Sequence, residues 1–184
     1  MLDVEGIGSV FLERSGKARR ITIRISPSGV RLIVPEGVSV SRGREFLSLK
    51  KEWIRKHVGR IASLAKEQRE TAMSARPITD VNHARNRIIQ RLYELSEQYD
   101  LPFERVVIRN QKSRWGSCSA RNIISLNIKL ARLPEELMDY VILHELVHTK
   151  IKGHGKDFWR LLGQVSGNAF NLRKELGRYS PAVL

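Results

Sequence analysis

Five consecutive residues in the last third of the chain, His144-Glu145-Leu146-Val147-His148, form the pattern H-E-x-x-H. On a helix, residues four apart lie on the same face, so both imidazoles can reach one metal ion while Glu145 flanks its open side. A catalytic zinc site has three protein ligands and an exchangeable water, whose pKa the metal lowers to about 7 so that a nearby carboxylate can take its proton. The motif therefore predicts metal-dependent hydrolysis and leaves one ligand to be found.

His154 is the preferred third ligand, because it follows Gly153, where the helix can end and the chain can turn back toward the metal. Glu175 is an alternative, at the longer separation used where a later helix completes such a site. A further alternative is that His144 and His148 bind no metal and are core or surface histidines of an ordinary helix. The metzincin pattern is excluded, since Ile151 stands where that pattern has a glycine and no methionine follows His154.

The elements that must position these groups can be predicted from the pattern of the last third. Pro134 followed by Glu135 and Glu136 is typical of a helix start, because acidic side chains complement the positive end of the helix dipole. We expect this helix to end near residue 152, and a further helix to run from Lys156 to about residue 165. Phe158 and Trp159 on that second helix are predicted core residues that anchor the turn carrying His154.

The preceding part of the chain indicates an α+β protein rather than a strict alternation of strands and helices. Alternating apolar residues predict a β-hairpin over residues 19–34, with its turn at Ser26-Pro27-Ser28-Gly29. Helices are expected over residues 41–65 and 81–99, with a linker over 71–80, and β-strands over 103–109 and 123–130. These patterns predict an N-terminal hairpin-and-helix region over residues 1–78 and a second region over 79–184, in which a small mixed sheet packs on helices.

The chain is strongly basic, with 33 Lys and Arg against 19 Asp and Glu in 184 residues, a formal net charge of +14. The charge is spread over both halves, because residues 1–78 hold 16 basic and 8 acidic side chains and residues 79–184 hold 17 and 11. Basicity of this size suggests non-specific nucleic-acid binding. No apolar run is long enough to span a membrane, no signal peptide is recognised, and the single cysteine, Cys118, fits a reducing compartment, so a cytoplasmic location is expected.

Beyond the H-E-x-x-H motif, the chain resembles the YgjP-like metallopeptidase family, predicted zinc-dependent hydrolases of the zincin class. The resemblance rests on matching segments along nearly the whole chain: Arg19-Arg20-Ile21, Ser28-Gly29, Val34-Pro35, Trp53-Ile54, the run from Arg114 to Ser119, Ser125-Leu126-Asn127, Pro134, the run from Asp139 to His148, His154 and Phe158-Trp159. It implies that residues 79–184 form a zincin-like metallopeptidase core, that His144, His148 and His154 bind Zn²⁺ and that Glu145 is the general base. The family commonly has Asn before the third histidine, where this chain has Gly153. More distantly the family is similar to the SprT-like and WLM proteases, which act on proteins crosslinked to DNA.

The leading hypothesis is thus a zinc-dependent peptidase that acts on a protein or peptide substrate. The alternatives are a basic nucleic-acid-binding protein with a structural zinc and a DNA-associated protease of the SprT type. Residues 123–130 form either the edge strand that pairs with an extended substrate or a plain inner strand. Tyr179, Arg114 and the amides of the edge strand are the candidates for stabilising the oxyanion.

Overall fold

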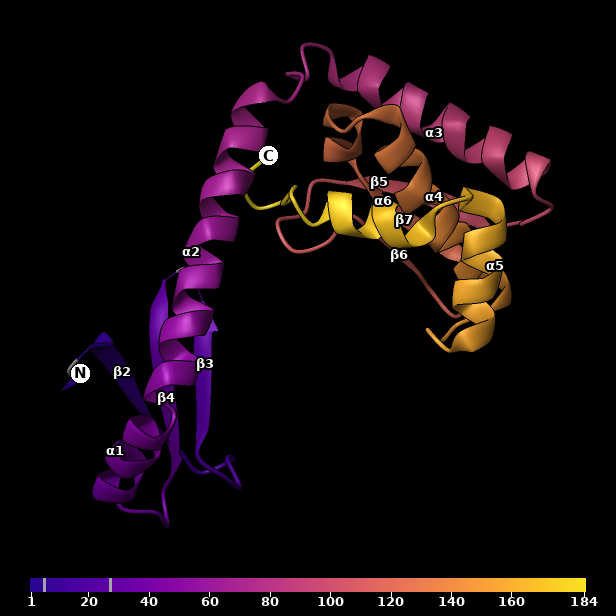
Figure 1. Ribbon diagram of the computed structural model, residues 1–184. Coiled ribbons are helices and arrows are strands. Elements are labelled where there is room, and N and C mark those ends of the chain that lie inside the picture. The colour runs from indigo at the N-terminus through magenta and orange to yellow at the C-terminus, as the bar shows by residue number, and fades with distance from the viewer. Residues whose placement is uncertain (5, 27) are drawn as a thin grey trace. The chain divides into compact units, whose positions relative to one another are not determined.

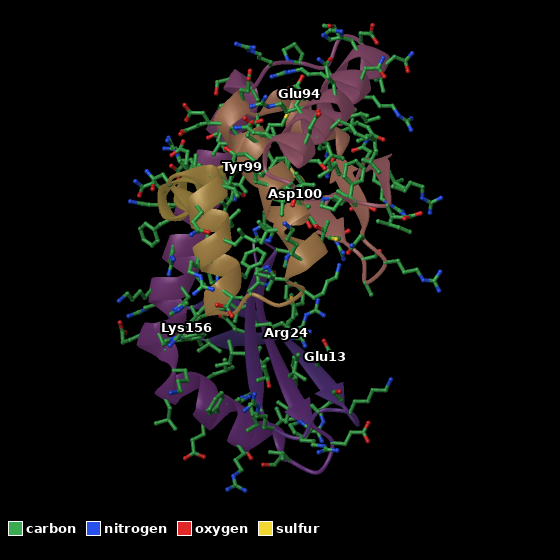
Figure 2. The ribbon with its side chains drawn as sticks, turned by 90° about the vertical axis from the view of Figure 1, so that its right-hand side faces the viewer. Glu13, Arg24, Glu94, Tyr99, Asp100 and Lys156 are labelled. Atoms are coloured by element: carbon green, nitrogen blue, oxygen red, sulfur yellow. The ribbon has the colours of Figure 1, made fainter. Side chains whose placement is uncertain are left out.

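A computed structural model describes residues 1–4, 6–26 and 28–184 and divides the chain into two compact units, Met1–Glu67 and Gln68–Leu184. In both units charged side chains stand at the surface, for example Arg24 in the first and Lys156 in the second (Figure 2). Within the described residues no helix combines the length and the apolar character that a membrane span requires. The domain boundary expected between residues 78 and 79 stays a prediction.

The first unit is built on a four-stranded sheet in the order β1-β2-β4-β3, with strands β1 (Leu2–Val4), β2 (Gly8–Ser15), β3 (Thr22–Ser26) and β4 (Gly29–Pro35) (Figure 1). Strands β3 and β4 pair antiparallel with Ile25 opposite Val30, so the predicted hairpin is confirmed. Pro27 of the expected turn lies outside the described residues. The alternating pattern buries Val30, Leu32 and Val34 on one face, where the side chains of Leu47 and Ile54 pack against them.

Two helices follow the sheet where one was expected over residues 41–65. Helix α1 (Val40–Leu49) ends at Lys50, and helix α2 (Lys51–Ser74) begins at the next residue. Because the break occupies one residue, the apolar spacing continues across it and gives no sign of the interruption. Helix α2 also runs through the first part of the expected linker, since residues 66–74 lack apolar periodicity but contain good helix formers. Of the linker expected over residues 71–80, only residues 75–80 lie outside a helix.

The second unit begins with the end of α2 and continues with helix α3 (Val81–Gln98), whose start agrees with the prediction. The Asp80 carboxylate caps this helix by accepting hydrogen bonds from the backbone N–H groups of Asn82 and His83, at 2.8 and 3.0 Å. Arg132 holds the end of α2 by donating to the carbonyl oxygens of Ala72 and Arg76.

A three-stranded sheet then forms in the order β5-β7-β6, with strands β5 (Arg105–Arg109), β6 (Gly116–Cys118) and β7 (Ile123–Asn127). Strand β7 pairs parallel with β5 and antiparallel with β6. The expected strand over 123–130 therefore ends at Asn127, beyond which the chain forms a 3₁₀-helix, η1 (Ile128–Arg132). It is an inner strand, so of the two sequence-based alternatives the inner strand is correct and the substrate-pairing edge is wrong; β5 and β6 are the two edges of this sheet.

The chain ends with helices α4 (Glu135–Lys150), α5 (Lys156–Ser166) and α6 (Ala169–Leu176), of which α6 was not expected. Helix α4 is buried on nearly all sides, within a core that also includes residues of α3, β7 and α5. Arg91 of α3 fixes one side of α4 by a bidentate ion pair with Asp139, at 2.8 and 2.6 Å. The predicted α+β class, a small mixed sheet packed on helices with the H-E-x-x-H helix near the C-terminus, is confirmed.

Candidate metal centre

Helix α4 and the turn after it bring the three histidines of the motif together. His144 and His148 lie one turn apart on α4, while His154 lies in the connection between Lys150, the last residue of α4, and Lys156, the first of α5. One ring nitrogen of each histidine lies within 4.8 Å of the others, an arrangement that could hold a metal ion. The predicted alternative Glu175 is not part of this cluster; its carboxylate pairs with Arg178 at 2.9 Å.

The distances between the imidazole nitrogens fit a small divalent cation. The His154 Nε2 atom lies 3.1 Å from His144 Nε2 and 3.2 Å from His148 Nε2. Two nitrogens bound tetrahedrally to zinc at about 2.0–2.1 Å each would lie about 3.3 Å apart. His148 Nδ1 lies 2.9 Å from the carbonyl oxygen of Ile151, which can only accept, so Nδ1 carries the proton and Nε2 offers a lone pair to the centre of the cluster. Two of the three nitrogen–nitrogen distances are thus close to those of a zinc site, and the third pair lies within 4.8 Å.

The aromatic ring of Phe158, on α5, fixes the positions of all three imidazoles. It is fully buried, and its centroid lies 4.5 to 4.9 Å from the centroids of His144, His148 and His154. The ring stacks on His148, at an interplanar angle of 30°, and meets the other two edge to face. Phe158 thus acts as the apolar floor of the cluster, in agreement with its predicted anchoring role.

The side chain of Lys152 tethers the turn that carries His154 to the turn between β6 and β7. The Lys152 ammonium donates to the side-chain oxygen of Asn122 at 2.5 Å and to the carbonyl oxygen of Ser119 at 2.9 Å. Both acceptors lie in the turn between β6 and β7, where Asn122 adopts a left-handed backbone conformation with φ of 57°. The same ammonium lies 3.7 Å from Cys118 Sγ, and Cys118 is not a member of the histidine cluster.

Glu145 lies beside the histidines with its carboxylate against strand β6. Its side chain is buried, at 6% exposed, and a Cβ atom added at Gly116 would lie 2.7 Å from Glu145 Cγ and 2.8 Å from Oε1. Only glycine at position 116 therefore allows this close approach. The segment before β6 is held by the buried amide of Asn127, which donates to the carbonyl oxygens of Gln111 and Arg114 at 2.7 and 2.9 Å.

Burial shifts the pKa values of the motif residues away from their ordinary values. It raises the pKa of Glu145 to about 7, against the opposing charge of Arg114. It lowers the pKa of His144 to about 4, with smaller contributions from the charges of His148, His154 and Arg173. Burial also lowers the pKa of His148. Near neutral pH these imidazoles are uncharged in the absence of metal, and neutral imidazole is the form that binds a metal.

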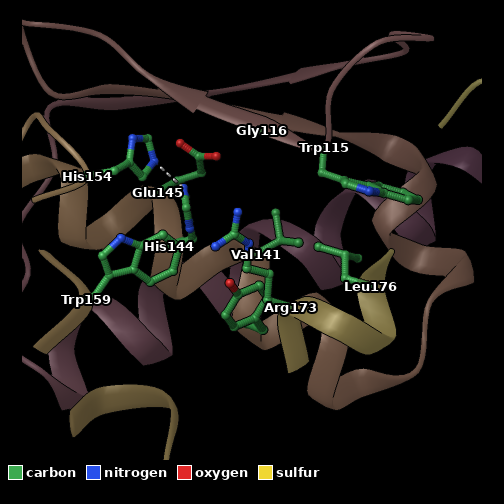
Figure 3. Close-up of a pocket in the computed structure, with 10 residues that line it drawn as sticks. Trp115, Gly116, Val141, His144, Glu145, His154, Trp159, Arg173 and Leu176 are labelled. Carbon is green, nitrogen blue, oxygen red and sulfur yellow. Dashed lines mark hydrogen bonds between the residues drawn. The ribbon is translucent and has the colours of Figure 1, made fainter. Parts of the chain in front are cut away.

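A pocket of about 450 Å³ opens beside the cluster and is lined by both charged and aromatic side chains (Figure 3). Its walls are Trp115, Gly116, Tyr140, Val141, His144, Glu145, His154, Trp159, Arg173 and Leu176. Arg173 was not anticipated, because α6 has no strong sequence signal of its own. Tyr179, a predicted oxyanion candidate, lines a different pocket together with Arg87 and Glu135.

The fold and the site together define an α+β protein with a three-histidine centre on and beside a buried H-E-x-x-H helix. Residues 19–79 and 80–179 match the model of the YgjP-like metallopeptidase domain, and the chain belongs to this family. It is accordingly a metal-dependent peptidase, and the resemblance inferred from the sequence is confirmed.

Two solved structures are similar over about half of the chain. The metallopeptidase zymogen of Methanocaldococcus jannaschii jannalysin has 26% sequence identity and a TM-score of 0.43, covering 48% of this chain and 92% of that one. The zymogen of Pyrococcus abyssi abylysin has 23% identity and a TM-score of 0.41, covering 50% of this chain and 98% of that one. No protein with curated function matches the chain. The family assignment rests on the match to the family model.

Proposed function

We propose that the chain is a zinc-dependent peptidase in which His144, His148 and His154 bind the metal and Glu145 is the general base. The observation that carries the proposal is the convergence of three Nε2 atoms, 3.1 and 3.2 Å apart, next to a buried carboxylate. Three imidazoles leave the further position for water and substrate that a catalytic site requires, whereas a structural zinc site has four protein ligands. The absence of Cys118 from the cluster supports the catalytic alternative.

Bound zinc supplies a Lewis acid that lowers the pKa of water to about 7 and polarises the carbonyl of the scissile bond. Glu145 takes the proton from the attacking water and transfers it to the nitrogen of the leaving amine. Its position supports this role, because it lines the same pocket as His144 and His154 and Gly116 leaves room for its carboxylate. Phe158 and the Lys152 tether hold the imidazoles in place during the reaction.

The substrate lies in extended form along β6, at the edge of the sheet. This strand pairs with β7 on one side only, and its first residue, Gly116, lines the pocket beside Glu145. A peptide that pairs with the open side of β6 would lie beside the pocket that Gly116 and Glu145 line, and main-chain hydrogen bonds of this kind give affinity with little dependence on sequence. The backbone N–H groups of β6 take the place of the amides of residues 123–130 as oxyanion candidates, and Arg114 stays a candidate from the sequence.

Replacement of Glu145 with Gln tests the proposal most directly. We expect the variant to retain about one zinc per chain, measured by atomic emission, and to lose roughly 10²–10⁴-fold in casein hydrolysis, the usual contribution of a general base. His148→Ala should instead lose both zinc and hydrolysis. Unchanged hydrolysis by Glu145→Gln would contradict the role of Glu145, and failure of the wild-type chain to bind zinc would contradict the metal assignment.

Nucleic acid remains a predicted partner, supported by the net charge of +14. Of the two nucleic-acid hypotheses, the DNA-associated protease is the one that agrees with membership of a metallopeptidase family. A cytoplasmic location likewise stays a prediction.

A further inference from the structure

We propose that Arg173 forms a carboxylate-binding subsite in the pocket beside the three histidines, and that it selects substrates which place a carboxylate there. The inference rests on the proposed function, since it assigns the substrate preference of the same site. Arg173 belongs to α6 and lines the pocket together with His144 and Glu145, with its side chain directed into the pocket (Figure 3).

Within the described part of the chain, the Arg173 guanidinium has no acidic partner. No carboxylate of a described residue forms an ion pair with it, and the acidic groups of neighbouring elements are engaged elsewhere: Glu175 pairs with Arg178, and Asp139 pairs with Arg91. Glu145 lines the same pocket but makes no ion pair or hydrogen bond with Arg173. The pocket therefore contains a cation whose counter-charge the described residues do not supply.

The indole of Trp159 holds Arg173 without using its hydrogen-bond donors. The guanidinium carbon lies 4.9 Å from the centroid of the ring, a distance typical of a cation–π contact. Such a contact uses the charge and leaves all five N–H donors available. None of these donors makes a hydrogen bond to another described residue. Arg173 is thus oriented toward the pocket and free to bind a planar anion through two parallel hydrogen bonds.

The position of Arg173 relative to the reacting groups supports a role in substrate binding. Arg173 lines the same pocket wall as His144 and Glu145, so a group bound to its guanidinium lies in the cavity that the motif residues face. The surrounding walls, Val141, Leu176 and the aromatic rings, are largely apolar. An anion bound between such walls is less well hydrated than at an open surface, which strengthens its attraction to the guanidinium.

Two groups of a peptide could supply the carboxylate: an Asp or Glu side chain near the scissile bond, or the free C-terminus of a short peptide. Both present the same planar anion to Arg173. A pocket of about 450 Å³ accommodates either, since it is within the range of ordinary ligand pockets. A competing role for Arg173 is stabilisation of the oxyanion, which would affect every substrate equally and can therefore be separated by experiment.

The test uses the full chain loaded with zinc and peptides taken from casein cleavage sites identified by mass spectrometry. One pair of peptides differs only by Glu or Gln at each position flanking the cut, and a second pair, without acidic side chains, differs by a free or an amidated C-terminus. Wild type, Arg173→Met, Arg173→Lys and the control Lys174→Met are compared by kcat/KM. Lys174 is the adjacent residue on α6 and is absent from the pocket wall.

We expect the wild type to prefer the carboxylate member of at least one pair by about tenfold or more, a difference of about 1.4 kcal/mol. Arg173→Met should abolish the preference by slowing only that member, Arg173→Lys should retain part of it, and Lys174→Met should leave it unchanged. The pair that shows the preference identifies the source of the carboxylate. An equal loss on both members in Arg173→Met would assign Arg173 to the oxyanion and overturn the proposal, as would the absence of any preference.

Binding of the same peptides, labelled with a fluorophore, to the Glu145→Gln variant separates this inference from the proposed function. If the wild type cleaves none of the peptides but Glu145→Gln binds the carboxylate members more tightly, and Arg173→Met in that background removes the difference, then the subsite stands and the proposed function fails. If cleavage occurs but neither rates nor binding depend on the carboxylate, the proposed function stands and the subsite fails.

Discussion

The two units of the chain differ in how much core they have and in what that core supports. Among the described residues of the first unit, seven buried apolar residues form the core, and the isoleucines of β3 are only partly covered. In the second unit the core has twenty buried apolar residues, eight of them on α4 itself, and two polar groups of the motif, Glu145 and His148, are buried among them. Three imidazoles can be held within a few ångströms of one another only where the surrounding core fixes their side chains. The proposed metal centre therefore lies in the unit with the larger core.

The largest expected effect comes from removing the floor of the histidine cluster. Phe158→Ala should destabilise the second unit by about 3–5 kcal/mol, because it leaves a cavity beneath three imidazoles. Calorimetry should show a lower melting temperature for the second unit and weaker zinc binding. Leu47→Ala, a matched truncation in the core of the first unit, should lower stability without changing the affinity for zinc. Equal weakening of zinc binding by the two variants would contradict the expectation that zinc affinity depends on the core of the second unit alone.

Removal of the metal should have the next largest effect and should be confined to the second unit. Zinc at 100 times its dissociation constant stabilises the folded state by about 2.7 kcal/mol, since it binds only the native cluster. Dialysis against a chelator is therefore expected to lower the melting temperature of the second unit and to leave the transition of the first unit in place. Hydrogen exchange localises the change: amides of α4 should lose protection, and amides of β4 should not. An equal loss of protection in α4 and β4 would contradict the expectation that metal removal affects only the second unit.

A smaller effect is expected at the contact between strand β6 and the carboxylate of Glu145. Gly116→Ala places a methyl group where the Glu145 side chain now lies, and the flexible end of that side chain moves aside more easily than the strand. Peptide hydrolysis should fall by about tenfold, equivalent to about 1.4 kcal/mol in the barrier, while the melting temperature changes little. Gly163→Ala serves as the control, since its added Cβ meets no other atom within 4 Å. Equal hydrolysis by the two variants would show that the approach of β6 to Glu145 is not required.

The parts of the molecule that could be predicted from the sequence are those whose signal is local. That the imidazoles of His144 and His148 lie on one face follows from their separation of four residues on a helix. The hairpin follows from apolar residues that alternate with polar ones on both sides of a turn. Helix α3 was placed correctly because its apolar residues repeat with helical spacing over most of its length. For these elements a few adjacent residues contain the necessary information.

The remainder depends on contacts between distant segments. Strand β6 has only three residues, Gly-Ser-Cys, with no apolar alternation, and becomes a strand because β7 pairs with it. Leu49 and Leu64 have the spacing of a buried face but are 76% and 37% exposed, since spacing does not show whether a partner covers them. Arg173 acquires its place only when α6 packs against α4 and α5, so no local pattern could identify it.

Cys118 has a practical consequence that follows from its place on the edge strand. It is the only cysteine of the chain and stands two residues after Gly116, on the same face of β6, with its thiol half-buried and its pKa raised by burial. A fluorophore or spin label can therefore be attached beside the histidine cluster without engineering a new residue or removing others. The rate at which thiol reagents modify this single position would then record, in real time, when the rim of the site is covered and when it is open.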